Sequence, residues 1–331
     1  MKQVFTFIAA AFLLVVVGCQ PKTGNNNDTT ESSVTQPEQS VMTPIALKDC
    51  NLAFTSTSDM VFLANADSNA VAPFDVEKDT VFNYVFVTDL NRFYYTVKTN
   101  NTLKLRYIDF NDETVVPHDV IDWGKTPQDC FSETDGLPAK LIYKNNSLYI
   151  ACDFDWDSYN FSRAMVYDLT TNTLRKSKLT NNSNEYMDLI TSNNDEGSDS
   201  FSMQNQQYYY KMNGKKVCLS DKIDFNSLVS DPDYAEPREF FYPAISPDGK
   251  RVCYGVMVEM GDLGHGPYCI ANLDGSGQKA LKGTDLSNSY KPKWTESGSL
   301  VFISDTLLNV IRPAQSEPEV LYDRTKMFVI K

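Results

Sequence analysis

Histidine is scarce in this chain, and its scarcity disfavours several kinds of active site. The 331 residues contain only two histidines, His118 and His265. A His-rich metal site, or a facial triad of two histidines and a carboxylate, is therefore disfavoured. No G-x-S-x-G motif precedes either histidine, which also argues against a Ser-His-Asp hydrolase. The simpler interpretation of both is a histidine on the surface or in a loop.

Clusters of positive charge are also lacking. Lys and Arg number 30 against 43 Asp and Glu, which gives a net charge of −13. No run of consecutive basic residues is longer than pairs such as Lys215-Lys216 and Lys250-Arg251. Proteins bind nucleic acids through clustered Lys and Arg that release counterions from the phosphates. We therefore expect no nucleic-acid partner.

The sequence has no apolar run long enough to span a membrane, but it begins with a shorter one. Lys2 precedes an apolar stretch over 5–17, which is too short for a stable transmembrane helix and is typical of a signal peptide. The stretch ends in Val16-Val17-Gly18-Cys19 and resembles the bacterial lipobox. An ordinary secretory signal with a chance cysteine is the alternative.

The lipobox resemblance implies that residues 1–18 are removed and that Cys19 carries the lipid. Two or more acyl chains anchor a protein stably, whereas a single chain does not. Gln20, where Asp would imply retention in the inner membrane, implies the outer membrane. Residues 19–46 are then the lipidated cysteine and a polar tether, because their Asn, Thr, Ser, Gln and Pro cannot bury a core.

The remaining residues, 47–331, are predicted to form one all-β domain. Aromatic residues make up 12% of the chain, and Thr, Val and Ile are plentiful. These residues favour strands. No Pro- or Gly-rich linker follows residue 45, which argues against two separate β-sandwiches.

One segment, 242–284, contains the clearest repeat unit. A strand ends at Ser246-Pro247-Asp248-Gly249, which has the chemistry of a tight turn. Strands are expected at 251–258, 268–272 and 278–281. The next unit aligns without gaps at an offset of 49, which places Trp294 on Ile245 and Val301 on Val252.

The Ser-Pro-Asp-Gly-Lys turn, with Pro243 and Ile245 before it, resembles the TolB-type, WD-like β-propeller repeat. The resemblance implies a β-propeller, with six blades of four antiparallel strands or, alternatively, seven blades. Six blades of about 47 residues fit the chain, since propellers contain about four to eight. The expected blades are 51–80, 81–127, 128–182, 185–231, 238–284 and 288–323. We expect the last residues, 327–330, to add a strand to the short first blade.

In the resembled repeat, one rim carries the partner contacts. Here it would hold the loops 153–162 and 259–266. The candidate binding residues on this rim are Asp153, Asp155, Trp156, Asp157, Asp262 and His265.

Calcium at Asp153, Asp155 and Asp157 is the alternative to a solvated acidic loop. Alternation puts the three carboxylates on one side of an extended chain. The EF-hand spacing fails, because Ser158 stands where Gly is needed and Ala164 where the bidentate Glu belongs. We therefore expect no metal and no cofactor.

Export would permit disulfides among the six cysteines other than Cys19. Cys253 and Cys269 lie directly opposite each other if their hairpin centres on Gly261. Buried free thiols are the alternative. The absence of any C-x-x-C disfavours zinc ribbons and thioredoxin-like chemistry.

Two functions remain open from the sequence. The first is a lipid-anchored, TolB-like binding platform for envelope proteins that is not an enzyme. The second is a propeller hydrolase that acts on glycans, esters or lactones with carboxylates or calcium in its central channel. The predicted location is the bacterial cell envelope, and the face of the membrane is left open.

Overall fold

The computed structural model describes ten stretches of the chain, which are residues 45–99, 102–122, 140–151, 165–176, 201–205, 207–212, 215–224, 239–257, 266–286 and 290–331. The signal peptide, Cys19 and all but the last two residues of the predicted tether lie outside these stretches. Within them, no helix is long and apolar enough to cross a membrane.

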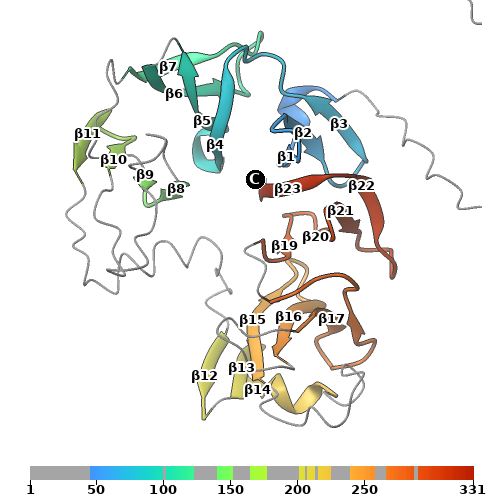
Figure 1. Cartoon of the computed structure of the whole chain (residues 1–331). Coiled ribbons are helices and arrows are strands. Elements are labelled where there is room, and N and C mark those ends of the chain that lie inside the picture. Colours follow the sequence, from blue (N-terminus) through green and yellow to red (C-terminus); the bar gives the residue numbers. More distant parts are fainter. Residues whose placement is uncertain are drawn as a thin grey trace, which may run out of the picture. The chain divides into compact units, whose positions relative to one another are not determined.

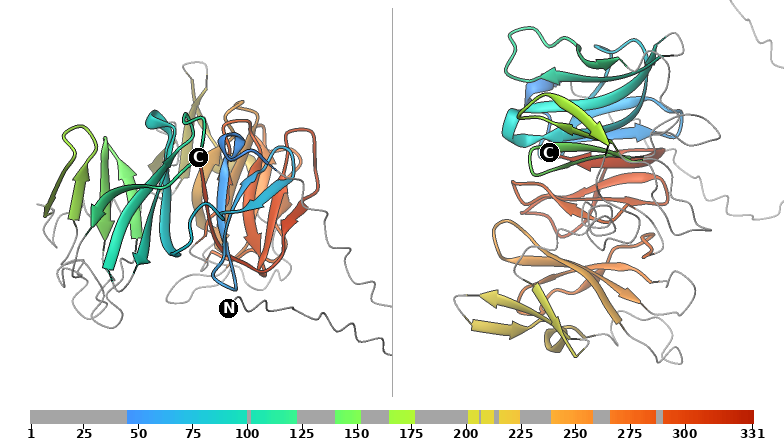
Figure 2. Two further views of the ribbon diagram at one scale, coloured as in Figure 1. Left: turned by 90° about the horizontal axis from the view of Figure 1, so that it is seen from above. Right: turned by 90° about the vertical axis from the view of Figure 1, so that its left-hand side faces the viewer.

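The described residues form six antiparallel sheets, five of four strands and one of three (Figures 1 and 2). The first three sheets contain, in spatial order, the following strands. The first has β23 (Thr325–Ile330), β1 (Leu52–Ser56), β2 (Val61–Asn65) and β3 (Ala70–Pro73). The second has β4 (Thr80–Val87), β5 (Arg92–Thr99), β6 (Thr102–Asp109) and β7 (His118–Asp122). The third has β11 (Thr173–Lys176), β10 (Met165–Asp168), β9 (Ser147–Ala151) and β8 (Lys140–Lys144).

The last three sheets follow the same plan. The fourth has β12 (Phe201–Gln204), β13 (Gln207–Met212) and β14 (Lys215–Cys218). The fifth has β15 (Glu239–Ile245), β16 (Arg251–Met257), β17 (Tyr268–Asn272) and β18 (Lys279–Ala280). The sixth has β19 (Lys293–Trp294), β20 (Leu300–Ser304), β21 (Leu307–Ile311) and β22 (Glu319–Tyr322). Short 3-10 helices are η1 (Leu47–Asp49), η2 (Thr88–Leu90) and η4 (Ser220–Lys222).

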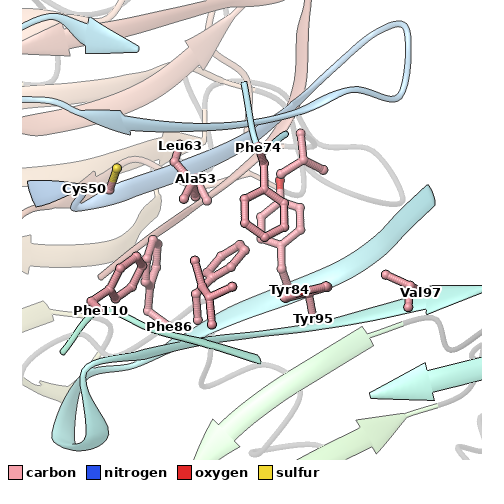
Figure 3. Close-up of a cluster of buried hydrophobic side chains, with 12 residues drawn as sticks. Cys50, Ala53, Leu63, Phe74, Tyr84, Phe86, Tyr95, Val97 and Phe110 are labelled. Carbon is pink, nitrogen blue, oxygen red and sulfur yellow. The ribbon is translucent and has the colours of Figure 1, made fainter. Parts of the chain in front are cut away.

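Hydrophobic clusters join one sheet to the next. The cluster of Figure 3 packs Ala53 and Leu63 of the first sheet against Phe93 and Tyr95 of the second. Similar clusters join the second sheet to the third, the fourth to the fifth, the fifth to the sixth and the sixth to the first. The middle strands are therefore buried on both faces, as the burial of β5 from Phe93 to Val97 shows. This stacking of four-stranded sheets confirms the predicted β-propeller, and each sheet lies within its predicted blade range apart from strand ends and β23.

The two ends of the domain meet in the first sheet, as the sequence predicted. β23 pairs antiparallel with β1, with Ala53 opposite Val329 and Phe54 opposite Phe328. It takes the first position of the sheet, which β4 fills in the second sheet. Phe328 is 3% exposed and packs in the cluster that joins the first and sixth sheets. The apolar tail is therefore an integral strand of the fold.

The two repeat turns share their hydrogen bonds but differ in length. Gly249 (φ 69°) donates to the Ser246 carbonyl, and Gly298 (φ 86°) donates to the Thr295 carbonyl. Glycine suits both positions because it adopts positive φ without steric cost. The second turn is one residue shorter, since Ile245 pairs with Val252 whereas Trp294 pairs with Leu300.

The gapless alignment is therefore wrong beyond the turn, where Leu300 and not Val301 is the counterpart of Val252. The packing agrees with this shift. Val252 packs toward the preceding, fourth sheet, and Leu300 likewise packs toward the preceding, fifth sheet.

The suggested pairing of Cys253 with Cys269 is also corrected. Cys253 lies opposite Ile270, and Cys269 lies opposite Tyr254. A register shift of one residue turns a side chain to the other face of a sheet. Cys253 accordingly packs toward the sixth sheet and Cys269 toward the fourth, and both are buried free thiols. Burial raises the pKa of Cys269 to about 12.

Candidate functional site

The rim predicted from the sequence falls outside the described residues. None of Asp153, Asp155, Trp156, Asp157, Asp262 and His265 has a described position, so their role stays a prediction. The part of the chain that is described holds no group of three or more His, Cys, Asp or Glu side chains placed to bind a metal ion.

A different candidate site lies where the first and second sheets meet. A pocket of about 650 Å³ opens between the connector that follows β3 and the outer strands β6 and β7. Its wall combines charged, aromatic and apolar side chains: Val76, Glu77, Lys78, Asp79, Arg106, Tyr107, Pro117, His118 and Asp119. The connector supplies residues 76–79, including the acidic Glu77 and Asp79, whereas β6 supplies Arg106 and Tyr107 and β7 supplies His118 and Asp119.

Glu77 is the buried carboxylate of this site, with a side chain only 3% exposed. Its Oε1 accepts hydrogen bonds from the backbone N–H groups of Lys78 (2.8 Å) and Asp79 (2.9 Å). Its Oε2 accepts one from the Tyr95 hydroxyl at 3.0 Å. Arg106 Nη1 lies 3.0 Å from both oxygens. The carboxylate is thus fully supplied with donors, as a buried charge requires.

Arg106 links two carboxylates of the connector to one on β7. Besides Glu77, its Nη1 lies 3.0 Å from Asp79 Oδ2, and its Nε donates to Asp119 Oδ1 at 2.6 Å. The β6–β7 register sets this geometry, because Arg106 lies directly opposite Asp119. Burial acts to lower the pKa of Arg106, but its hydrogen bonds to Asp119 and Glu77 outweigh burial and raise it.

Asp119 also pairs with a second cation. Lys104, two residues before Arg106 and on the same face of β6, donates to Asp119 Oδ2 at 3.0 Å. The hydrogen bond from Arg106, followed by that from Lys104, lowers the pKa of Asp119 despite its partial burial. Asp119 therefore keeps its charge to a lower pH than an isolated Asp does.

Tyr107 and His118, which also line the pocket, belong to a stack of aromatic and cationic groups. The Arg92 guanidinium lies 4.4 Å above the Tyr107 ring, and the His118 ring stacks on Tyr107 at 4.8 Å. Arg92 Nε donates to Asp109 at 2.8 Å, and His118 Nε2 lies 2.9 Å from Asp112 Oδ2. His118 is thus a strand residue with a carboxylate partner, and its side chain is 38% exposed, in agreement with the surface position suggested by the sequence.

The arrangement offers fixed charges and flat rings, and its charged groups are paired with one another. Its acids therefore serve to position side chains and to present charge, and they are poorly placed to exchange protons with a substrate. Sequence reasoning missed this site because Glu77 and Arg106 are 29 residues apart and meet only through the packing of two sheets. The alternation of Lys104 and Arg106 on one strand is the one signal that the sequence offers.

Of the known proteins compared with this chain, only solved structures are similar to it. No family model matches the chain, and no curated protein matches it. TolB from Acinetobacter baumannii is 12% identical over 86% of this chain and 67% of its own, with a TM-score of 0.37. A candidate 6-phosphogluconolactonase from Bacteroides uniformis is 10% identical over 86% of this chain and all (100%) of its own, with a TM-score of 0.39.

A third similar structure is the β-propeller domain of the Trilobed protease from Pyrococcus furiosus. It is 11% identical over 79% of this chain and 73% of its own, with a TM-score of 0.28. TolB, whose repeat the Ser246–Gly249 turn resembles, is thus among the structures to which this fold is similar.

Proposed function

We propose that this protein is a lipid-anchored β-propeller of the bacterial cell envelope that binds another envelope protein and performs no chemistry itself. The pocket between the first and second sheets is the binding surface that the described residues support best. Lipid attachment at Cys19 and the tether over 19–46 would hold the propeller at the membrane.

The pairing of the charges in the pocket is the observation that carries the proposal. Glu77, Asp79 and Asp119 all lie within 3.0 Å of a nitrogen of Arg106. A general acid or base must be within hydrogen-bond reach of the substrate, and carboxylate oxygens that already accept hydrogen bonds from the protein are poorly placed for that contact. The pocket therefore supports recognition by shape and charge better than it supports acid–base catalysis.

The exposed parts of the pocket can contact a partner without breaking the buried ion pair between Glu77 and Arg106. Asp119 is 53% exposed, whereas Glu77 is 3% exposed. The flat surface of His118 against Tyr107 adds aromatic area, which is common at protein interfaces. We expect a partner surface that carries a basic side chain to face Asp119.

The anchor is tested by the Cys19→Ala variant. We expect this variant to appear in the soluble fraction or to keep its signal peptide, because the acceptor of the lipid is gone. Membrane fractionation and the mass of the intact protein measure this outcome. Unchanged fractionation together with an unchanged mass would contradict the anchor.

The binding role is tested by affinity capture from envelope extract. The tag is best inserted within residues 22–40, because the C-terminal strand β23 belongs to the first sheet. The test variant is His118→Ala with Asp119→Asn, and the control is Glu317→Gln, which neutralises an exposed acid paired with Lys279 in another region. We expect the test variant to lose a partner that the control retains. Equal capture by both variants, or turnover of a lactone or glycan by the purified protein, would contradict the proposal.

A further inference from the structure

Two polar groups in the wall of the pocket have no hydrogen-bond partner among the described residues. Asp79 Oδ2 accepts hydrogen bonds from Arg106 Nη1 at 3.0 Å and from Thr99 Oγ1 at 2.5 Å, whereas Asp79 Oδ1 accepts none from the described part of the chain. Arg106 uses Nη1 for Glu77 and Asp79 and Nε for Asp119, and its Nη2 donates to no described residue. The pocket therefore offers one open acceptor and one open donor group.

The open acceptor is a particular property of Asp79 among the three carboxylates of the pocket. Both oxygens of Glu77 accept hydrogen bonds, and its side chain is only 3% exposed. Each oxygen of Asp119 accepts one, from Arg106 and from Lys104. The Asp79 side chain is 29% exposed, so a ligand can reach its open oxygen without displacing a contact within the protein.

The open donor and the open acceptor lie close together, because their residues are joined by an ion pair. Arg106 Nη1 and Asp79 Oδ2 are 3.0 Å apart, and Nη2 and Oδ1 are bonded to the same carbons as these two atoms. A ligand that contacts both groups must therefore carry a donor and an acceptor only a few bonds apart. The wall has three carboxylates against Lys78 and Arg106, and this excess of negative charge favours a cationic donor.

We infer that the pocket binds the N-terminus of a partner chain, with the α-ammonium on Asp79 Oδ1 and the first carbonyl oxygen on Arg106 Nη2. The α-ammonium nitrogen and the carbonyl carbon of a first residue share one Cα, which gives the required spacing. Both contacts are charge-assisted hydrogen bonds, and capture of an N-terminal amine is a recurring mode of peptide recognition. A lysine or arginine side chain supplies a cation with no carbonyl beside it. This inference rests on the proposed function, because it takes the pocket as the surface that binds the partner protein.

The remainder of the wall suits the first residues of an extended chain. The volume of about 650 Å³ lies in the range of small-ligand sites and is too small for a folded element. Val76 and Pro117 provide apolar contacts for a small first side chain. An exported protein whose signal peptide has been removed presents a new amine of this kind.

The inference is tested by calorimetric titration of the full chain in detergent with three peptides. Trialanine amide has a free N-terminus, and acetyl-trialanine amide lacks the ammonium. Acetyl-dialanyl-lysine amide has the same net charge as trialanine amide but carries its ammonium on a side chain. We expect trialanine amide to bind at least about tenfold more tightly than either acetylated peptide. Free alanine, which has no second residue to fill the pocket, should bind more weakly than trialanine amide.

Two variants assign the preference to the open oxygen of Asp79. Asp79→Asn should bind trialanine amide at least about tenfold more weakly, because the charge that faces the ammonium is gone. Asp122→Asn is the matched control, since it neutralises an exposed carboxylate of β7 outside the pocket wall and should bind as the parent does. Thermal melting shows whether each variant is folded. If Asp79→Asn fails to fold, the comparison of peptides on the unaltered protein still decides the inference.

The inference is overturned if either acetylated peptide binds as tightly as trialanine amide, if free alanine binds more tightly, or if folded Asp79→Asn binds as the parent does. Affinity capture from envelope extract tests the proposed function separately. Capture that depends on His118 and Asp119, together with no distinction among the peptides, would overturn this inference and leave the proposed function standing. Equal capture by the His118→Ala, Asp119→Asn variant and its control would instead contradict the proposed function.

Discussion

Two junctions between sheets each contain a partly buried arginine, and the two arginines are satisfied in different ways. At the junction of the first and second sheets, Arg106 contacts the carboxylates of Glu77, Asp79 and Asp119. At the junction of the fifth and sixth sheets, Arg251 Nη2 donates to the Gly298 carbonyl at 2.8 Å. Its guanidinium also lies 5.0 Å from the centre of the Trp294 ring.

The two environments shift the pKa of the two guanidinium groups in opposite directions. Burial lowers the pKa of Arg251, and Asp248 compensates only in part. Burial would also lower the pKa of Arg106, but the hydrogen bonds to Asp119 and Glu77 raise it. Carbonyl dipoles and an aromatic face thus suffice to hold an arginine between sheets. At the Arg106 junction, by contrast, each charge is stabilised by the opposite charges beside it, so the loss of one charge destabilises the others.

The largest loss of folding stability is expected at the apolar junction of the first and sixth sheets. Deletion of residues 325–331 removes β23, exposes the edge of β1 and removes the buried Phe328 side chain. We expect the whole domain to unfold cooperatively at a much lower temperature, with a loss of at least about 3–5 kcal/mol, the usual cost of removing one buried Phe.

Thermal and urea unfolding measure this effect. The control is Lys326→Gln on β23, which removes only the exposed ion pair with Asp59, a residue between β1 and β2. A truncated protein that melts within a degree of the parent would show that the tail is dispensable.

The two arginines should differ in the cost of their removal. Arg106→Met leaves Glu77 buried without its cation, and breaking a buried pair in this way costs about 3–5 kcal/mol. Arg251→Met leaves only carbonyls without a donor, at about 1–3 kcal/mol. Urea midpoints of the two variants test the order, and an equal or larger loss for Arg251→Met would refute the distinction drawn here.

Acid should weaken the first junction selectively. The pKa of Asp119 is lowered in the folded state, so its contribution to stability is present above the unfolded pKa of about 3.9 and is lost as the pH falls through the folded value. We expect Asp119→Asn to lose less stability than the parent between pH 6 and pH 3. Arg251→Met should keep the acid dependence of the parent. Urea unfolding at both pH values provides the measurement.

The smallest effect is expected at the acidic loop predicted from the sequence. If Asp153, Asp155 and Asp157 are solvated, Asp155→Asn should change stability by no more than about 0.5 kcal/mol. Calcium at millimolar concentration should then leave the melting temperature unchanged. A calcium-dependent rise that disappears in Asp155→Asn would show that a cation binds there, since a ligand of the folded state stabilises it by mass action.

Local patterns were sufficient to predict much of the fold. The turn at Ser246–Gly249, the strands β16 and β17 and the apolar tail all follow from residues that are close in the sequence. The candidate pocket could not be predicted in this way. Glu77 belongs to a connector with no regular pattern, and its burial depends on Arg106 and Tyr95 of the next sheet.

The sequence by itself determined the all-β fold and the strand that joins the two ends, because turn chemistry and apolar strands act over short distances. The tertiary structure decided the register and the partners. One residue fewer in the turn before Leu300 shifts the alignment of the sixth sheet, and one step in the register of β16 and β17 separates Cys253 from Cys269. Side chains alternate between faces along a strand, so a single step decides which sheet each residue meets.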